Sequence, residues 1–351
     1  KTDETMSQAQ RITHIDSLRG MAVLLMVMVH AAATWNPFQG TQQSILAYVI
    51  SGLGGLAAPL FVTLFGWGII RSQLGLKQRM LQSLFLFSAQ ILVNTTSPHL
   101  FHLFTPGILS LFGLLTLILP SFTNRIQSHG MQLLLIAIAL IFATQYFFPE
   151  LQGAGIWTER ISDDTPSTIL SNMLFTGTYP LFPWIIFAIL GATISGMQPS
   201  PNTTLTTNPS MKYTLGFGLL FCSITFLHSY FNNALWAHPT NADAYLTFFP
   251  ANTAFIIAAF TGVLIIWYII QAYEFEYLNS TGKISLTIYL IHFIPLSLMQ
   301  NYEDIYQWGL GPSALAVLLY TIAWIPISAQ WLKYWPKINA ETTLRSIRKP
   351  R

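Results

Sequence analysis

Three ionisable side chains stand along one apolar segment near the start of the chain: Asp16, Arg19 and His30. At 100° per residue, all three lie on one face of a helix, and Asp16 and Arg19 are close enough to pair. His30 lies about 16 Å along the axis from Arg19 and about 21 Å from Asp16. Ionisable groups are costly in hydrocarbon, so three on one face favour a functional stripe. The alternatives are an anchoring arginine with its neutralising carboxylate and a histidine that bonds a neighbouring helix.

The stretch between these groups is small or flexible, with Gly20, Val23, Met26 and Val27 on the same face. Such a face packs tightly on another helix or lines a narrow apolar groove. The groove would begin at a cation and end at an imidazole. It would suit a ligand with an anionic head, a thin neutral arm and a reactive tip, which is the form of acyl-coenzyme A.

The composition indicates a polytopic membrane protein. Of the 351 residues, 52% are hydrophobic and only 8% are charged, whereas an average soluble domain is about 25% charged. The single cysteine, Cys222, excludes an internal disulfide and a multi-cysteine metal site. The sequence contains no P-loop, H-E-x-x-H or dinucleotide fingerprint. We therefore expect no bound metal and no nucleic-acid partner.

Ten apolar runs are long enough to cross a bilayer, and they predict one all-α domain over residues 1–351. The predicted spans are about 18–35, 45–70, 79–94, 101–120, 131–148, 180–197, 212–229, 250–272, 283–300 and 310–332. Tails of about 1–15 and 333–351 remain. The polar first ten residues, with no A-x-A-like site after the first apolar run, indicate no cleavable signal peptide.

Basic residues predict the orientation of these spans. With a cytoplasmic N-terminus and ten alternating crossings, every Lys and Arg except Arg160 falls on the cytoplasmic side, as the positive-inside rule expects. Both termini are then cytoplasmic, and we expect a bacterial inner membrane. The outer loops 149–179 and 230–249 carry aromatic and acidic groups that would suit a sugar; the alternative is interfacial anchoring.

Five segments resemble the heparan-α-glucosaminide N-acetyltransferase family and the broader transmembrane acyltransferases, including acyltransferase type 3. The first is R-x4-D-x2-R-G, from Arg11 to Gly20, followed by an apolar helix that ends at His30. The others, in order, are APLFVTLFGWGII (58–70), TPGILSLFGLL (105–115), YPLFPWIIFAILGATI (179–194) and TGKISLTIYLIHFIP (281–295). The resemblance covers nearly the whole chain.

The resemblance implies transfer of an acetyl or acyl group from cytoplasmic acetyl-CoA, or another acyl-CoA, to an acceptor across the bilayer. In the lysosomal member the acceptor is a terminal glucosamine amine, so we expect a glycan or amino sugar here. That member has Asn where this chain has His30, whereas the type 3 family resembles this chain in having His. We therefore expect His30 to be the general base, in a catalytic stripe with Asp16 and Arg19.

Basic side chains predicted to face the cytoplasm are candidates for the CoA phosphates: Arg11, Arg19, Arg71, Arg79 and Lys283. For Arg71 and Arg79, the alternative is a charge that only sets topology. Lys283 follows Gly282, where we expect a helix N-terminus whose free N–H groups favour anions.

Four residues are candidates for the acceptor side: Asn36, His102, Trp184 and His292. His292 would orient His30 or the acceptor, or else be satisfied by a backbone carbonyl. Asn36 would support the tetrahedral intermediate. His102 would approach the acceptor, and Trp184 would either line the site or fill the core.

A competing hypothesis is a small-molecule or lipid transporter, or a flippase, in which the stripe on the first helix lines a permeation path. The scarcity of membrane carboxylates argues mildly against proton coupling. The sequence leaves the acceptor, the acyl length and the oligomeric state open, a homodimer included.

Overall fold

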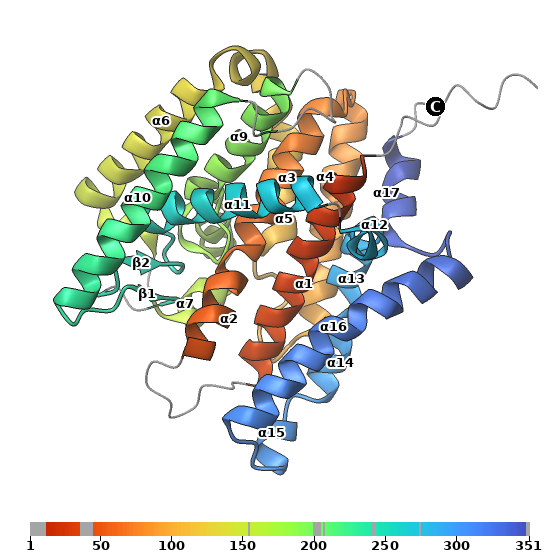
Figure 1. Cartoon of the computed structure of the whole chain (residues 1–351). Helices are drawn as coiled ribbons and strands as arrows, with labels where there is room; N and C mark the ends of the chain where they lie inside the picture. The colour runs from red at the N-terminus through yellow and green to blue at the C-terminus, as the bar shows by residue number, and fades with distance from the viewer. Residues whose placement is uncertain are drawn as a thin grey trace, which may run out of the picture.

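The computed structural model is almost entirely helical (Figure 1). It describes residues 12–35, 45–153, 155–198, 205, 208–240, 243–273 and 275–348. The elements are α1 (Thr13–Trp35), α2 (Ile45–Gly55), α3 (Ala57–Arg71), α4 (Leu76–Thr96), α5 (Ile108–Ile118), η1 (Leu119–Phe122), α6 (Thr123–Phe147), η2 (Pro149–Gln152), α7 (Trp157–Ile161), α8 (Pro166–Ser171), η3 (Asn172–Thr176), α9 (Leu181–Met197), α10 (Pro209–Phe231), β1 (Ala237–His238), β2 (Leu246–Thr247), α11 (Thr253–Tyr273), η5 (Glu276–Leu278), α12 (Asn279–Lys283), α13 (Ser285–Ile291), α14 (Phe293–Leu298), α15 (Tyr302–Ile305), α16 (Leu310–Tyr334) and α17 (Ala340–Arg348).

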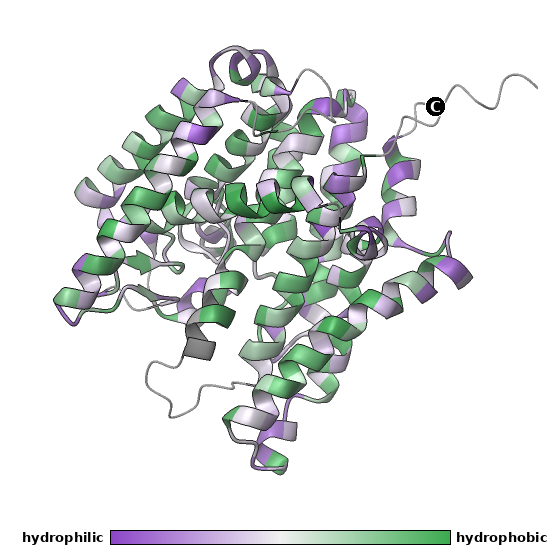
Figure 2. Cartoon of the chain, in the orientation of Figure 1, coloured by the Kyte–Doolittle hydropathy of each residue, from purple (hydrophilic) through white to green (hydrophobic). Residues whose placement is uncertain are grey.

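A multi-pass membrane protein is the class that these helices indicate. By length and apolarity, six helices of the described chain are able to cross a membrane, or up to eight if each of two bent pairs is one span. Figure 2 shows apolar residues along the long outer helices such as α10 and α16. In the candidate spans of these two helices, only 11% and 22% of the residues, respectively, are buried inside the protein. Those exposed apolar faces are suited to lipid.

Each of the ten predicted spans overlaps a helix, but the number of crossings stays a prediction. The helix α4 covers the third predicted span and is not among the candidates. The fourth and fifth predicted spans correspond to α5 and α6, which count together as one stretch of 40 residues, Ile108–Phe147. A straight helix of that length would measure about 60 Å, roughly twice the hydrocarbon thickness.

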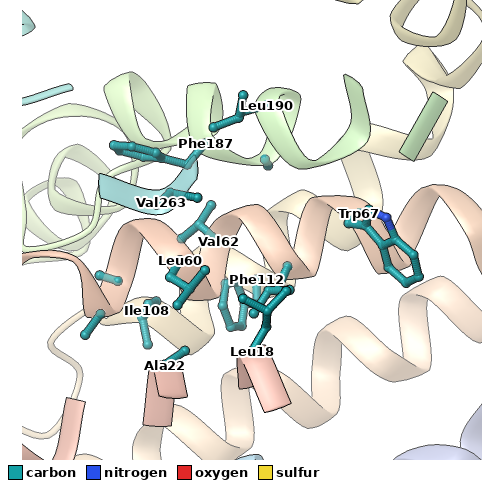
Figure 3. Close-up of a cluster of buried hydrophobic side chains, with 14 of the residues drawn as sticks. Leu18, Ala22, Leu60, Val62, Trp67, Ile108, Phe112, Phe187, Leu190 and Val263 are labelled. Carbon is teal, nitrogen blue, oxygen red and sulfur yellow. The ribbon is translucent and has the colours of Figure 1, made fainter. Parts of the chain in front are cut away.

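The core forms where α1, α3, α5, α9 and α11 meet (Figure 3). Leu18 and Ala22 of α1 contribute to it, as do Leu60 and Val62 of α3 and Phe187 of α9, all 0% exposed. Helices α3 and α9 approach so closely that a Cβ added to Gly191 would overlap the carbonyl oxygen of Thr63. Small residues permit such contacts, which stabilise helix pairs where lipid supplies no hydrophobic drive.

A second close crossing joins the first helix to a segment late in the chain. Helix α12 packs on α1 so that a Cβ added to Gly282 would overlap the carbonyl oxygen of Asp16 and lie 3.0 Å from the backbone nitrogen of Gly20. On the other side, a Cβ on Gly20 would overlap the carbonyl oxygen of Leu278. The Ser17 hydroxyl donates to Asn279 Oδ1 at 2.7 Å, beside this crossing. The first helix and the late Gly-Lys segment are therefore direct neighbours.

Directly after this crossing the late segment bends. The helices before and after the break at Lys283 and Ile284 meet at 62°. Lys283 therefore ends α12 and does not open a helix, which corrects the prediction from the sequence. The predicted C-terminal tail is also structured in part, because α17 packs beside α4 and α13. Between α10 and α11, β1 and β2 form a short parallel pair.

We predict that Gly282→Ala destabilises the protein. The added methyl group has no room between two backbones, and overpacking of this kind typically costs about 1–3 kcal/mol. The measurement is the apparent Tm of purified protein in detergent. Gly216→Ala on α10 is the matched control, because its Cβ would meet nothing within 4 Å. An equal Tm for wild type and Gly282→Ala would contradict the close crossing.

Candidate functional site

A pair of histidines joins α1 to the segment between α13 and α14. His30 Nδ1 lies 2.9 Å from His292 Nε2, and the two rings are nearly parallel, with centroids 5.1 Å apart. His292 is fully buried, whereas His30 is partly exposed. The Phe293 ring packs 4.6 Å from the His30 ring. The structure thus brings together two residues that the sequence placed 262 positions apart.

The backbone fixes the direction of the hydrogen bond between the two imidazoles. His292 Nδ1 lies 3.0 Å from the carbonyl oxygen of Ile288 and 2.9 Å from that of Tyr289. A carbonyl oxygen only accepts, so the neutral His292 ring carries its proton on Nδ1 and leaves Nε2 as an acceptor. His30 must then donate from Nδ1. Its Nε2 is left with a free lone pair, which is the state of a proton acceptor.

Neighbouring groups hold this pair in place. The Tyr320 hydroxyl of α16 donates to the backbone carbonyl of His292. One turn beyond His30, the Thr34 hydroxyl donates to the His30 carbonyl at 2.9 Å. The Trp35 indole donates to the Met299 carbonyl at 3.0 Å and ties the end of α1 to α14. His292 thus contacts two backbone carbonyls and His30, and its role in orienting His30 stays a prediction.

At the other end of α1, Asp16 and Arg19 form the expected ion pair. Arg19 Nη1 lies 3.5 Å from Asp16 Oδ1. The Asp16 side chain is 4% exposed and that of Arg19 38% exposed. We call the surroundings of this pair, including the ends of α12 and α17, the basic end. The guanidinium stays accessible there, while its carboxylate partner is shielded.

The C-terminal helix contributes to the basic end a cation that sequence analysis missed. Arg348 Nε donates to Gln82 Oε1 at 2.9 Å, and Gln78 Nε2 donates to the Arg348 carbonyl at 2.7 Å. Burial, together with the positive charge of Arg19, lowers the pKa of Arg348 to about 10. Two cations thus share one region. Only the high helical amphipathicity of residues 340–348 could have predicted this helix, and nothing in the sequence indicates where it docks.

A carboxylate of α17 occupies the N-terminus of α13. Glu341 Oε1 accepts from the backbone N–H of Leu286 at 2.6 Å and of Thr287 at 3.2 Å. Glu341 Oε2 accepts from the Thr287 hydroxyl at 2.6 Å. The free N–H groups that the sequence assigned to an anionic ligand beside Lys283 are therefore taken by the chain itself.

The remaining predicted phosphate contacts differ in their surroundings. Arg71 is committed within the protein, because it donates to the Ser195 hydroxyl at 2.7 Å and stacks 4.6 Å over Trp67. Arg79 is partly buried, and its Nε has no hydrogen-bond partner among the described residues. Arg11 lies outside the described residues. Arg19 is thus the predicted contact best placed for a phosphate.

Of the predicted acceptor residues that the structure describes, His292 contacts His30, whereas His102 and Trp184 have other neighbours. His102 is exposed before α5, where its Nδ1 lies 3.6 Å from Asp163 Oδ1. Trp184 is 1% exposed and packs between Tyr179 and Phe248, as the alternative reading of a core residue expected. Asn36 lies outside the described residues. His99 approaches the end of α1 instead, with Nε2 3.5 Å from the Thr34 hydroxyl.

The face of α1 between Arg19 and His30 is packed. Val23 and Val27 are 0% exposed and Met26 is 5% exposed. This matches the alternative in which the small-residue stripe packs on neighbouring helices. Within the described residues there is also no cluster of three or more His, Cys, Asp or Glu side chains that could hold a metal ion.

Comparison with known proteins adds one finding. A family model, described as heparan-alpha-glucosaminide N-acetyltransferase, catalytic, matches residues 11–233. This range is more than half of the chain and includes Asp16, Arg19 and His30, while His292 lies beyond it. A search of curated proteins finds no match.

We predict that Glu341→Ala lowers the apparent Tm by roughly 1–3 °C, because loss of a helix cap costs about 1 kcal/mol. The substitution leaves the N–H groups of Leu286 and Thr287 without their acceptor. Thermal denaturation in detergent measures the effect. The control is Glu276→Ala, which removes an exposed carboxylate. Equal shifts for both variants would show that Glu341 does not cap α13.

Proposed function

The chain belongs to the heparan-alpha-glucosaminide N-acetyltransferase catalytic family, and on that premise we propose a donor, an acceptor and a general base for its reaction. It is a membrane acetyltransferase. We infer that the acetyl or acyl group comes from acyl-CoA bound at the basic end, which we assign to the cytoplasmic side. The acceptor is a sugar amine or hydroxyl on the opposite side.

One observation carries this proposal: the hydrogen bond of 2.9 Å between His30 and His292, with its direction fixed by two backbone carbonyls. His30 Nε2 is thereby a lone-pair nitrogen on an oriented ring, as a general base requires. A packing histidine would not need a second imidazole whose own proton is committed to the backbone. The arrangement supports proton transfer at His30 with His292 as a positioning residue.

The reaction balances with these groups alone. The acceptor nitrogen or oxygen attacks the thioester carbonyl carbon while His30 Nε2 takes its proton. The tetrahedral intermediate then collapses, the carbon–sulfur bond breaks, and the CoA thiolate receives the proton from the His30 imidazolium. The products are the acetylated acceptor and free CoA, and His30 returns to its neutral form.

The donor has to reach about 16 Å from Arg19 to His30. A CoA phosphate would pair with the accessible guanidinium of Arg19, with Arg348 nearby. The thin pantetheine arm would follow α1, whose face is closed in this structure. Access therefore requires neighbouring helices to separate from α1. The same closed face gives no support to a standing permeation path along this helix.

We predict that His30→Ala lowers acetyl transfer by about 10²–10⁴-fold, the usual contribution of a general base. The assay uses purified protein, radiolabelled acetyl-CoA and glucosamine as the first acceptor. His292 offers a matched pair. His292→Gln keeps an acceptor for the His30 Nδ1–H and should retain most activity, whereas His292→Leu should lose about tenfold, the worth of one hydrogen bond. Near wild-type rates for folded His30→Ala would exclude the proposed base.

We predict that Arg19→Gln raises the KM for acetyl-CoA by about tenfold or more, because a hydrogen bond to a charged group contributes about 1.5–3 kcal/mol. The kcat should change little, and Arg19→Lys should fall in between. Asp16→Asn combined with Arg19→Gln avoids leaving a buried carboxylate without its arginine neighbour, so that an effect on binding can be separated from misfolding. An unchanged KM in the folded double variant would mean that the donor phosphates bind elsewhere.

A further inference from the structure

A turn between α4 and α5 brings a third histidine to the end of α1. His99 Nε2 lies 3.5 Å from the Thr34 hydroxyl oxygen, and that hydroxyl donates to the His30 carbonyl. Thr34 stands one helical turn beyond His30. His99 therefore lies beside the same end of α1 as the proposed base, although it comes from a loop that the resemblance did not single out.

The hydrogen bonds also determine where the neutral His99 ring carries its proton. The Thr34 proton is committed to the His30 carbonyl, so its oxygen can only accept from His99. His99 then holds its proton on Nε2 and has a lone pair on Nδ1. This Nδ1 is buried and has no hydrogen-bond partner among the described residues. A buried acceptor without a donor destabilises the folded protein, and a bound donor would remove that cost.

Aromatic rings connect the His99 turn to the His30 ring. The Trp157 indole donates to the Leu100 carbonyl at 3.3 Å. The Phe101 ring lies 6.0 Å from the Trp157 ring and 6.0 Å from the Phe293 ring. Phe293 in turn packs on His30. Phe101 and Trp157 are partly buried, and with Phe293 they form a row of rings that runs from the His99 turn to His30.

We propose that His99 binds the acceptor, its Nδ1 accepting a hydrogen bond from a hydroxyl adjacent to the group that reacts at His30. The inference rests on the proposed function and deepens it by naming the residue that would hold the hydroxyl next to the reacting group of a sugar acceptor. The ring of such a sugar carries neighbouring donors for the two lone pairs, at His30 Nε2 and His99 Nδ1. Its apolar face would pack on the Phe101 and Trp157 rings.

Two substitutions at His99 separate binding from structure. Asn has a carbonyl oxygen near the position of Nδ1, so His99→Asn keeps the acceptor but loses the contact with Thr34. Gln reaches the Nε2 position, so His99→Gln keeps the contact with Thr34 but loses the acceptor. His129→Gln, at an exposed histidine on α6, is the control.

The experiment measures steady-state acetyl transfer from acetyl-CoA to glucosamine and to cyclohexylamine, which lacks the adjacent hydroxyl. We expect wild type to prefer glucosamine. His99→Gln should raise the KM for glucosamine at least tenfold and leave the KM for acetyl-CoA within twofold. His99→Asn should stay within threefold of wild type for both substrates. The reactivity toward cyclohexylamine should be equal in all four proteins.

The outcomes separate the two proposals. If wild type acetylates no acceptor, the proposed function fails and this inference fails with it. If wild type transfers acetyl but His99→Gln keeps the wild-type KM for glucosamine, only the role of His99 is overturned. Greater loss in His99→Asn than in His99→Gln, with a similar loss in Thr34→Val, would assign His99 a structural tie instead. The apparent Tm of each variant identifies any that misfolds, and a loss of the glucosamine-induced Tm shift in folded His99→Gln supports binding.

Discussion

The backbone contact between α1 and α12 positions the proposed chemistry. Gly282 packs against the carbonyl of Asp16 and the nitrogen of Gly20, and the two segments then run in the same direction. His30 follows Gly20 by ten residues, and His292 follows Gly282 by ten. Equal distances from one crossing bring the two imidazoles to the same level, despite the bend of 62° between α12 and α13. A side chain at either glycine would change the separation of the segments that carry both histidines.

The apolar surroundings explain why the polar groups form pairs. Inside a bilayer no water satisfies a stray donor, so an ionisable side chain needs a partner from the protein. His292 finds two carbonyls and His30 finds His292. At the opposite end, the buried carboxylate of Asp16 pairs with Arg19. In each pair one residue is partly exposed, His30 in the first and Arg19 in the second.

The sequence predicted the relations that depend on one helix. Helical spacing placed Asp16 beside Arg19 and directed His30 to the same face, because a single regular helix determines such positions. The partnership of His30 with His292 was only one alternative, since it requires the crossing of two distant segments. The break after Lys283 was not foreseen: an uninterrupted apolar run carries no signal for a bend. The docking of α17 was also missed, because the sequence of a charged tail does not show which distant residues it will contact. In the structure these partners are Gln82 and Thr287.

The packed face of α1 and the bend beside it bear on how a donor would enter. Val23 and Val27 are fully buried. A thioester that binds at Arg19, as proposed, would therefore reach His30 only if a neighbouring segment moved. Helix α12 is short and ends at the bend that leads into α13. Helix α13 is in turn tied to α17, because Glu341 accepts hydrogen bonds at its N-terminus. Movement of α12 and α13 would carry His292 with it and release the His30 ring. The closed face of α1 and the oriented His30 ring belong to one packed state. In the proposed mechanism, the helices would therefore open for the donor and close again before His30 could act as a base.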